Sequence, residues 1–298
     1  IYFVTIGLGM PDSLAQALSP ESPLNPSFFA YGSFTFYLLK LVGALLGPLS
    51  PALRDPDNLH LVGRPLAALL DVATIYLTYR LARNLWSRAG GPRREPGEQG
   101  DRPQVTTELA AEHRGRTLGL VAAALVSFAT LHVQLAHFYT ADVLLVFFVL
   151  LCLNLAVDVG QGAGRKLQAA LALAFGLALA TKLTAALLIV PIFVAYYIRS
   201  ASRSSRSSVA GSNLLTASLD LLPALLLAGV VLLVCQPYAV IDWRTFLADT
   251  LRESQIAWGT LDVPYTRQYA GTLPYVYPIW QTSLWGLGAL AGLLVWSA

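Results

Sequence analysis

The feature that most constrains this chain is the apolar run at residues 167–198, where Lys182 is the only charged side chain. A helix crosses a bilayer with about 20 residues, so this run is too long for one crossing. Ala180, Thr181 and Lys182 lie at its centre, and we expect a helical hairpin that bends there.

Similar apolar runs recur along the chain, which is 55% hydrophobic and only 12% charged. Soluble domains carry about 25% charged residues, so the composition indicates a membrane protein. We therefore predict an all-α polytopic membrane protein, a helical bundle with about seven membrane spans. Besides the two arms of the hairpin, the expected spans lie at about 65–81, 118–135, 143–157, 214–235 and 277–296.

The basic residues are unevenly distributed among the loops. Three loops, after residues 81, 157 and 198, fall on one side of the bundle if the chain bends at Lys182. Cytoplasmic loops carry an excess of Lys and Arg, so this side is predicted to be cytoplasmic, with its largest loop at 87–116. These loops hold 13 of the 20 basic residues: Arg80, Arg83, Arg88, Arg93, Arg94, Arg102, Arg114, Arg116, Arg165, Lys166, Arg199, Arg203 and Arg206.

The opposite, extracytoplasmic face then collects the unusual segments of a single membrane domain covering residues 1–298. They are the 1–58 segment, the 137–142 turn, the Lys182 bend and the 236–276 loop. Residues 1–27 read as an irregular connection with a short helix at about 13–18. Residues 28–46 either span the membrane or form an interfacial helix, and the charge pattern favours the interfacial helix.

The 236–276 loop combines many charges and aromatic rings. Loops of this length are usually functional or disordered, and its aromatic content argues against disorder. We interpret it as a folded, water-facing lobe that caps a site at the membrane surface. The alternative is a packed interfacial loop whose rings belong to the aromatic belt of the membrane.

Some function classes lack sequence support. Cys152 and Cys235 each lie in an apolar run and are interpreted as small buried hydrophobic residues, not as a disulfide or zinc site. There is no nucleotide-binding glycine loop and no hydrolase or metalloprotease motif. We expect no nucleic-acid partner. A lipid-linked substrate fits better, with its tail among the spans.

Asp142 stands at the outer start of a span, where an ionisable residue suggests a function. Its carboxylate is suited to act as a general base or as a ligand of a divalent metal. The alternative is that Thr140 or Asp142 caps the following helix. His137 lies five residues before Asp142, across a turn of the chain, and could face the same pocket, whereas His132 is interpreted as a packing or hydrogen-bonding residue.

Three basic residues are candidates for binding a substrate phosphate. Lys182 either extends to the membrane surface or binds phosphate as a point charge. Arg267 either grips phosphate or forms a salt bridge to Asp262. Arg64 either faces the site or pairs with Asp71, seven residues along the helix, to hold helices together.

Five segments occur in an order and spacing that resembles bacterial members of glycosyltransferase family 39. This family belongs to the GT-C superfamily, together with protein O-mannosyltransferases and aminoarabinose transferases. The segments are SPLNPSFFAYGSFTFYLL (22–39), GRPLAALLD (63–71), HFYTAD (137–142), ATKLTAALL (180–188) and QPYAVIDW followed by DVPYTRQYAGTLPYVYPIWQ (236–281).

The resemblance implies an inverting membrane transferase in the bacterial plasma membrane. It would move a sugar from a polyprenyl-phosphate donor to an acceptor glycan, lipid or protein on the extracytoplasmic face. Asp142 matches the second acidic position of the family, and Lys182 matches its Thr-Lys bend. The main catalytic Asp-Glu pair is expected just upstream of Ile1, so the sequence reads as a fragment that lacks the first span and the C-terminal part.

The outer loop of the family carries a Gln-Tyr signature, to which Arg267 and Tyr269 correspond. We expect Tyr265, Gln268, Tyr269 and Tyr275 to contact substrate or to order this loop. Two other functions stay open at this point: a polytopic transporter, which predicts helices broken near the membrane midplane, and a catalytically inactive homologue.

Overall fold

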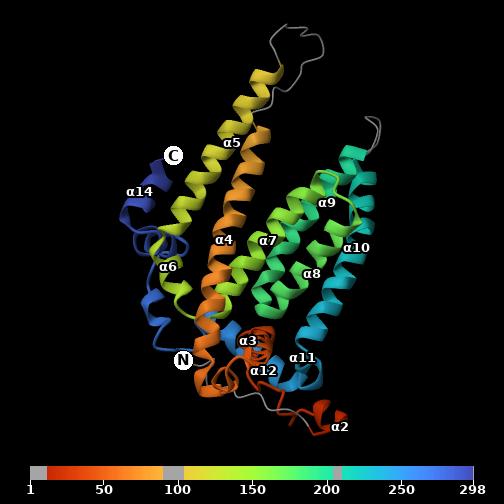
Figure 1. Ribbon diagram of the computed structural model, residues 1–298, viewed down its shortest axis with the longest axis vertical. Coiled ribbons are helices and arrows are strands. Elements are labelled where there is room, and N and C mark those ends of the chain that lie inside the picture. The colour runs from red at the N-terminus through yellow and green to blue at the C-terminus, as the bar shows by residue number, and fades with distance from the viewer. Residues whose placement is uncertain (1–11, 90–103, 204–209, 298) are drawn as a thin grey trace.

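The computed structural model describes residues 12–89, 104–203 and 210–297, and all regular structure there is helical (Figure 1). Residues 1–11 and parts of two predicted basic loops lie outside the described residues. The α-helices are α2 (Leu14–Ala17), α3 (Phe34–Leu46), α4 (His60–Ala89), α5 (Gln104–Ser127), α6 (Thr130–Ala136), α7 (Ala141–Gly160), α8 (Arg165–Thr181), α9 (Ile189–Arg203), α10 (Ala210–Cys235), α11 (Tyr238–Ile241), α12 (Trp243–Ala257), α13 (Val276–Gln281) and α14 (Ala289–Ser297).

Five short helical turns complete the chain. Four are of 3₁₀ type and one, η5, is a π-helix. They are η1 (Pro51–Arg54), η2 (Pro56–Asn58), η3 (Leu183–Leu188), η4 (Arg267–Tyr269) and η5 (Thr282–Gly286).

The long helices alternate in direction, so segments predicted to lie on opposite sides of the membrane belong to opposite ends of the bundle. Figure 1 shows the last turn of α4, the first turn of α5, the last turn of α9 and the first turn of α10 at one end of the bundle, and α2, α3, α11 and α12 at the other. The helix ends that border the predicted basic loops therefore lie opposite residues 236–257. The α5 helix already begins at Gln104, so the α4–α5 connection is shorter than the loop predicted at 87–116.

Four helices among the described residues are long and apolar enough to cross a membrane, or five if the bent pair α5–α6 counts as one span. The single-helix candidates are His60–Ser87, Ala141–Gly160, Leu183–Arg203 and Ser212–Cys235. This confirms the all-α polytopic membrane class, with fewer uninterrupted spans than the predicted seven.

Three predicted spans differ from the expected continuous helices. The helix expected at 118–135 is bent by 65° between α5 and α6. The segment expected at 277–296 is divided among α13, η5 and α14, and Gly288 adopts a positive φ of 85° at the break. The first hairpin arm, α8, has 17 residues, so it extends about 26 Å, slightly less than a hydrocarbon core of about 30 Å.

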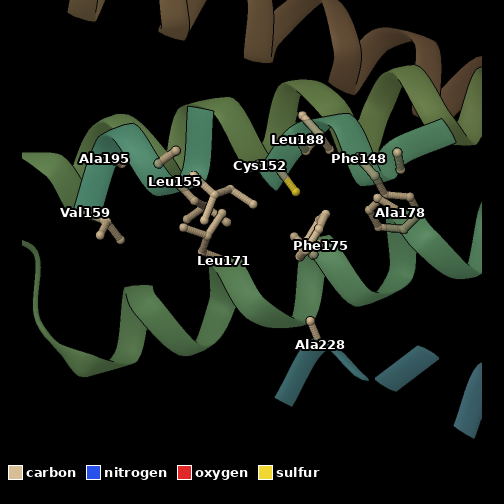
Figure 2. Packing of buried hydrophobic residues seen from close by; sticks show 14 of the residues in the cluster. Phe148, Cys152, Leu155, Val159, Leu171, Phe175, Ala178, Leu188, Ala195 and Ala228 are labelled. Atoms are coloured by element: carbon tan, nitrogen blue, oxygen red, sulfur yellow. The ribbon is translucent and has the colours of Figure 1, made fainter. Parts of the chain in front are cut away.

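The buried core lies among α7, α8, α9 and α10, where α7 packs against α8 and α9, and α10 packs against the same two helices. Figure 2 shows Phe148 and Cys152 of α7 pointing toward α8, Cys152 toward Phe175, with Ala228 of α10 on the opposite side of α8. Cys152 is fully buried, as predicted, and Cys235 is partly buried. Small residues allow close packing: a Cβ at Gly176 would lie 2.6 Å from the Ala228 carbonyl oxygen.

Polar side chains attach α4 to this core. The Arg80 guanidinium donates to Asp158 on α7 at 2.7 Å, and Asn154, fully buried, donates to the Leu77 carbonyl at 3.0 Å. The buried amide of Asn154 and the carboxylate of Asp158 thereby gain partners, which stabilises polar groups in an apolar interior.

The outer lobe packs against the N-terminal segment. The Tyr238 hydroxyl donates to the Ala17 carbonyl at 2.7 Å, and the Asn25 amide donates to Asp242 at 2.9 Å. The short helix predicted at 13–18 is α2, whose N-cap Ser13 accepts from the Gln16 N–H. The α3 helix has 13 residues, which is short for a span, and lies across the end of the bundle (Figure 1).

Candidate functional site

A cavity of about 1080 Å³ lies where the outer lobe meets the bundle. Four parts of the chain form its walls: the 27–31 segment, the first turns of α4, the residues before α7, and α12 with the loop that follows it. The polar side chains that line it include His60, Arg64, Arg252 and Glu253. Segments far apart in the sequence thus enclose one partly polar space.

An ion pair lies directly beside the Tyr31 wall of this cavity. The Lys182 ammonium donates to Asp142 Oδ1 at 2.9 Å, and it lies 5.4 Å from the centroid of the Tyr31 ring. The two charged side chains are 29% and 46% exposed, so the pair is accessible to water and to a ligand. An aromatic ring over an ammonium adds a cation–π attraction.

The local backbone explains how this pair forms. Lys182 has extended dihedral angles (φ −160°, ψ 129°) between α8 and η3, as expected for the hairpin bend. Asp142 lies in the first turn of α7, where a carboxylate interacts favourably with the helix dipole. Thr140 is the N-cap residue of α7, as the alternative interpretation allowed, but its side chain makes no capping hydrogen bond.

The Tyr31 segment is fixed against the hairpin bend by its backbone. The Gly32 N–H donates to the Thr181 carbonyl at 2.9 Å, next to Lys182. A Cβ at Gly32 would lie 1.7 Å from the Ala180 carbonyl oxygen, so only glycine allows this approach. The tripeptide around Gly32 therefore positions the Tyr31 ring over the lysine.

Tyr139 anchors the wall in front of α7. Its hydroxyl donates to the Thr35 carbonyl at 2.8 Å, and its Cβ would be 2.8 Å from a Cβ added at Gly63. Burial raises the pKa of Tyr139, which keeps this donor protonated. The turn before α7 is thus attached to both α3 and α4.

The α12 wall presents residues 249, 252, 253 and 256, which share one helical face. Asp249 accepts from the Phe29 backbone N–H at 2.8 Å, and Phe29 packs edge-to-face on Phe246 at 5.6 Å. These contacts position α12 against the Tyr31 segment. The side chains of Arg252 and Glu253 make no hydrogen bond or ion pair with another residue of the described ranges.

The pKa of Tyr31 is raised, first by burial. The ammonium of Lys182 lowers it, whereas Asp142, Glu253 and Tyr265 raise it further. The Tyr31 phenol therefore lies within electrostatic reach of the ion pair on one side and of the α12 wall on the other.

The structure brings some of the predicted site residues together and separates others. Arg64, on α4, lines the cavity, and so does Tyr265, in the loop after α12. Arg64 does not pair with Asp71: the carboxylate of Asp71 contacts His132 Nε2 at 2.6 Å, so the helix-holding partner is His132.

Other predicted site residues lie outside the cavity lining. His137 is exposed, and its Nδ1 contacts the Val133 carbonyl at 2.7 Å. It lies close enough to Asp71 to influence that carboxylate, on the α4–α6 side. His137 and Asp142 are thus not part of one wall.

The guanidinium of Arg267 donates two bonds to Asp262, at 2.9 and 2.7 Å, with both side chains 66% exposed. This is the salt bridge that formed the alternative interpretation, and it raises the pKa of Arg267. The Gln268 amide donates to the Tyr265 carbonyl at 3.0 Å.

Two further tyrosines of the lobe also lie outside the cavity lining. Tyr269 packs edge-to-face on Tyr277 at 5.8 Å, and Tyr275 is highly exposed.

The described residues do not fit a divalent metal at Asp142. No group of three His, Cys, Asp or Glu side chains comes together as a ligand set in the described part of the chain. Asp142 is paired with the Lys182 ammonium, whose positive charge opposes a second cation.

Sequence reasoning missed several side chains of the cavity, among them Tyr31, Arg252 and Glu253. Tyr31 lies inside the quoted FFAYGSF motif, which was a usable signal. The α12 face has the spacing i, i+3, i+4, i+7, but that pattern alone does not reveal which side of a surface helix faces a cavity.

Together these features define a multi-pass α-helical membrane protein with an ionic cavity at one end of its bundle. Residues 108–238 match the family described as dolichyl-phosphate-mannose-protein mannosyltransferase. The match confirms the family resemblance over this part of the chain and supports a membrane glycosyltransferase of the GT-C type. It includes Asp142 and Lys182. No curated protein and no solved structure matches the chain.

Proposed function

We propose that the protein uses this cavity to transfer a sugar from a polyprenyl-phosphate donor to an acceptor on the extracytoplasmic face. The observation that carries this proposal is the Lys182–Asp142 pair, which lies outside the cavity lining but next to Tyr31, a residue of that lining. The surrounding helices expose apolar side chains, which suit a polyprenyl tail. The opposite end of the bundle carries the basic loops, which supports an outward orientation.

In this proposal Lys182 and Arg64 bind the phosphate of the donor. The side chain of Arg64 makes no ion pair or hydrogen bond with another described residue, and it lines the cavity. Asp142 orients the lysine ammonium at 2.9 Å. Arg267, engaged by Asp262, orders the Tyr265–Tyr269 turn of the lobe instead of contacting phosphate.

The transfer is a single displacement with inversion. An acceptor hydroxyl oxygen bonds to the anomeric carbon while the bond from that carbon to the phosphate oxygen breaks, and the polyprenyl phosphate leaves with the electron pair. The acceptor proton passes to a carboxylate base as the new bond forms. Lys182 and Arg64 stabilise the negative charge that grows on the departing phosphate.

A substitution of Lys182 tests this assignment in the full-length protein, reconstituted with dolichyl-phosphate mannose and a peptide or glycan acceptor. Lys182→Ala should reduce turnover about 100- to 1000-fold, the usual effect of removing one charge-stabilising group. Lys166→Ala, at the far end of α8, removes an exposed lysine from the same helix and should leave turnover unchanged. Near-normal turnover of Lys182→Ala would remove the phosphate role.

A transporter is the second candidate, because two segments of the bundle are broken: α5–α6 and α13–η5–α14. Discontinuous helices are common at transporter binding sites. Against it, Asp142 and Lys182 lie at helix ends and not at a helix break in mid-membrane. Vesicle uptake of free sugar or of polyprenyl phosphate, without transfer to an acceptor, would favour the transporter.

A further inference from the structure

Building on the proposed function, we infer that α12 forms the subsite for the donor sugar, with Glu253 accepting hydrogen bonds from sugar hydroxyls between the rings of Tyr31 and Tyr265. All three side chains line the same cavity. The assignment names a neutral, polyhydroxylated sugar as the substrate class of this wall.

Glu253 is the cavity carboxylate that has capacity for a ligand. Asp249, one turn earlier on the same face, already accepts the Phe29 N–H at 2.8 Å. Asp142 already accepts a hydrogen bond from the Lys182 ammonium. The side chain of Glu253 has neither an ion pair nor a hydrogen bond to any residue in the described ranges, and it is exposed to the cavity.

Two aromatic side chains line the same cavity as this carboxylate. Tyr31 contributes its ring from the N-terminal segment, and Tyr265, which is 63% exposed, contributes its ring from the loop after α12. Glu253 and Tyr265 each raise the pKa of Tyr31, so both lie within electrostatic reach of it. Flat apolar rings beside a carboxylate match the alternating apolar faces and hydroxyl edges of a pyranose.

The position relative to the ion pair fits the geometry of the donor. Tyr31 links the two groups, since its ring is 5.4 Å from the Lys182 ammonium and it lines the same cavity as Glu253. A phosphate bound at Lys182 therefore places its attached sugar toward Glu253. Arg64 and Lys182 serve the phosphate, and Glu253 serves the sugar.

The test separates sugar binding from phosphate binding in the full-length protein in nanodiscs. The probes are dolichyl phosphate, dolichyl-phosphate mannose and dolichyl-phosphate glucose, and the readout is the dissociation constant of each. The wild type should bind at least one glycosylated lipid more tightly than bare dolichyl phosphate. Glu253→Ala should weaken that glycolipid about 10- to 100-fold, since hydrogen bonds to a charged group have this effect, with bare dolichyl phosphate unchanged.

Three variants act as controls. Lys182→Ala should weaken all three lipids. Gln255→Ala changes an exposed residue of α12 outside the cavity lining and should weaken none. Glu253→Gln keeps one acceptor oxygen and should lose only a few-fold.

Each outcome has a definite meaning. A wild type that binds none of the three lipids overturns the proposed function itself. Equal binding of bare and glycosylated lipids by the wild type, or an unchanged glycolipid affinity in Glu253→Ala, overturns the sugar subsite alone. A loss in Glu253→Gln as large as in Glu253→Ala overturns recognition of neutral hydroxyls, because it shows that the negative charge is what binds.

Discussion

Replacing Gly32 by alanine tests how the cavity is assembled. The added Cβ would lie 1.7 Å from the Ala180 carbonyl oxygen and 2.9 Å from the Thr181 carbonyl carbon, whereas Cβ contacts below 3.0 Å essentially never occur. Those atoms belong to the backbone and cannot rotate away. The Tyr31 segment and the hairpin bend must therefore separate by more than about 1 Å, which is a large displacement for a site.

Two losses follow from this displacement. Forcing a methyl group into a packed contact costs about 1–3 kcal/mol, and the Gly32–Thr181 hydrogen bond contributes about 1 kcal/mol more. The Tyr31 ring also moves away from Lys182, so we expect turnover to fall about 100-fold even where the protein stays folded.

The assay combines thermal unfolding in detergent with turnover of dolichyl-phosphate mannose. The matched control is Gly229→Ala on α10, where no heavy atom lies within 4 Å of the added Cβ. That variant should keep both its stability and its turnover. Wild-type stability and turnover in Gly32→Ala would show that the close contact between the two segments is wrong.

Two further predictions concern the lobe and the cavity. Arg267→Ala should lower turnover by no more than a few-fold and leave thermal stability almost unchanged, because both partners of its ion pair are exposed; a 100-fold loss of turnover would restore the phosphate role of this arginine. Stability should decrease above about pH 10, because burial raises the pKa of Tyr31 and the unfolded chain then releases a proton that the folded protein retains; thermal unfolding between pH 8 and 11 should show a smaller decrease in Tyr31→Phe.

Much of the fold is encoded in local composition and could be predicted. A lone lysine at the centre of an apolar run marks the hairpin bend, because an uncompensated charge is costly inside a bilayer. Serine at position 13 caps α2, as its type suggests. The folded part of the lobe at 238–257 follows from its aromatic residues, which pack on the N-terminal segment.

The helix break between α5 and α6 could not be predicted from residues 127–130, which contain neither proline nor glycine. Its support is tertiary. His132, on the first turn after the break, contacts Asp71 of α4 at 2.6 Å, and a Cβ added at Gly288 would lie 3.2 Å from the Thr130 hydroxyl. Helix propensity is a weak guide where such contacts decide the geometry.

The candidate site shows the same division between local and tertiary information. Lys182 and Asp142 are conspicuous because each is an ionisable residue at the end of an apolar helix. Glu253 and Arg252 are ordinary surface residues by sequence, and only the docking of α12 through Asp249 and Phe29 turns their face toward the cavity. Residues that stabilise charge at a helix end can thus be found from the sequence. The sugar subsite inferred on α12 depends on how this peripheral helix is held against the bundle, so under the proposed function substitutions at that contact should alter sugar specificity before they alter phosphate binding.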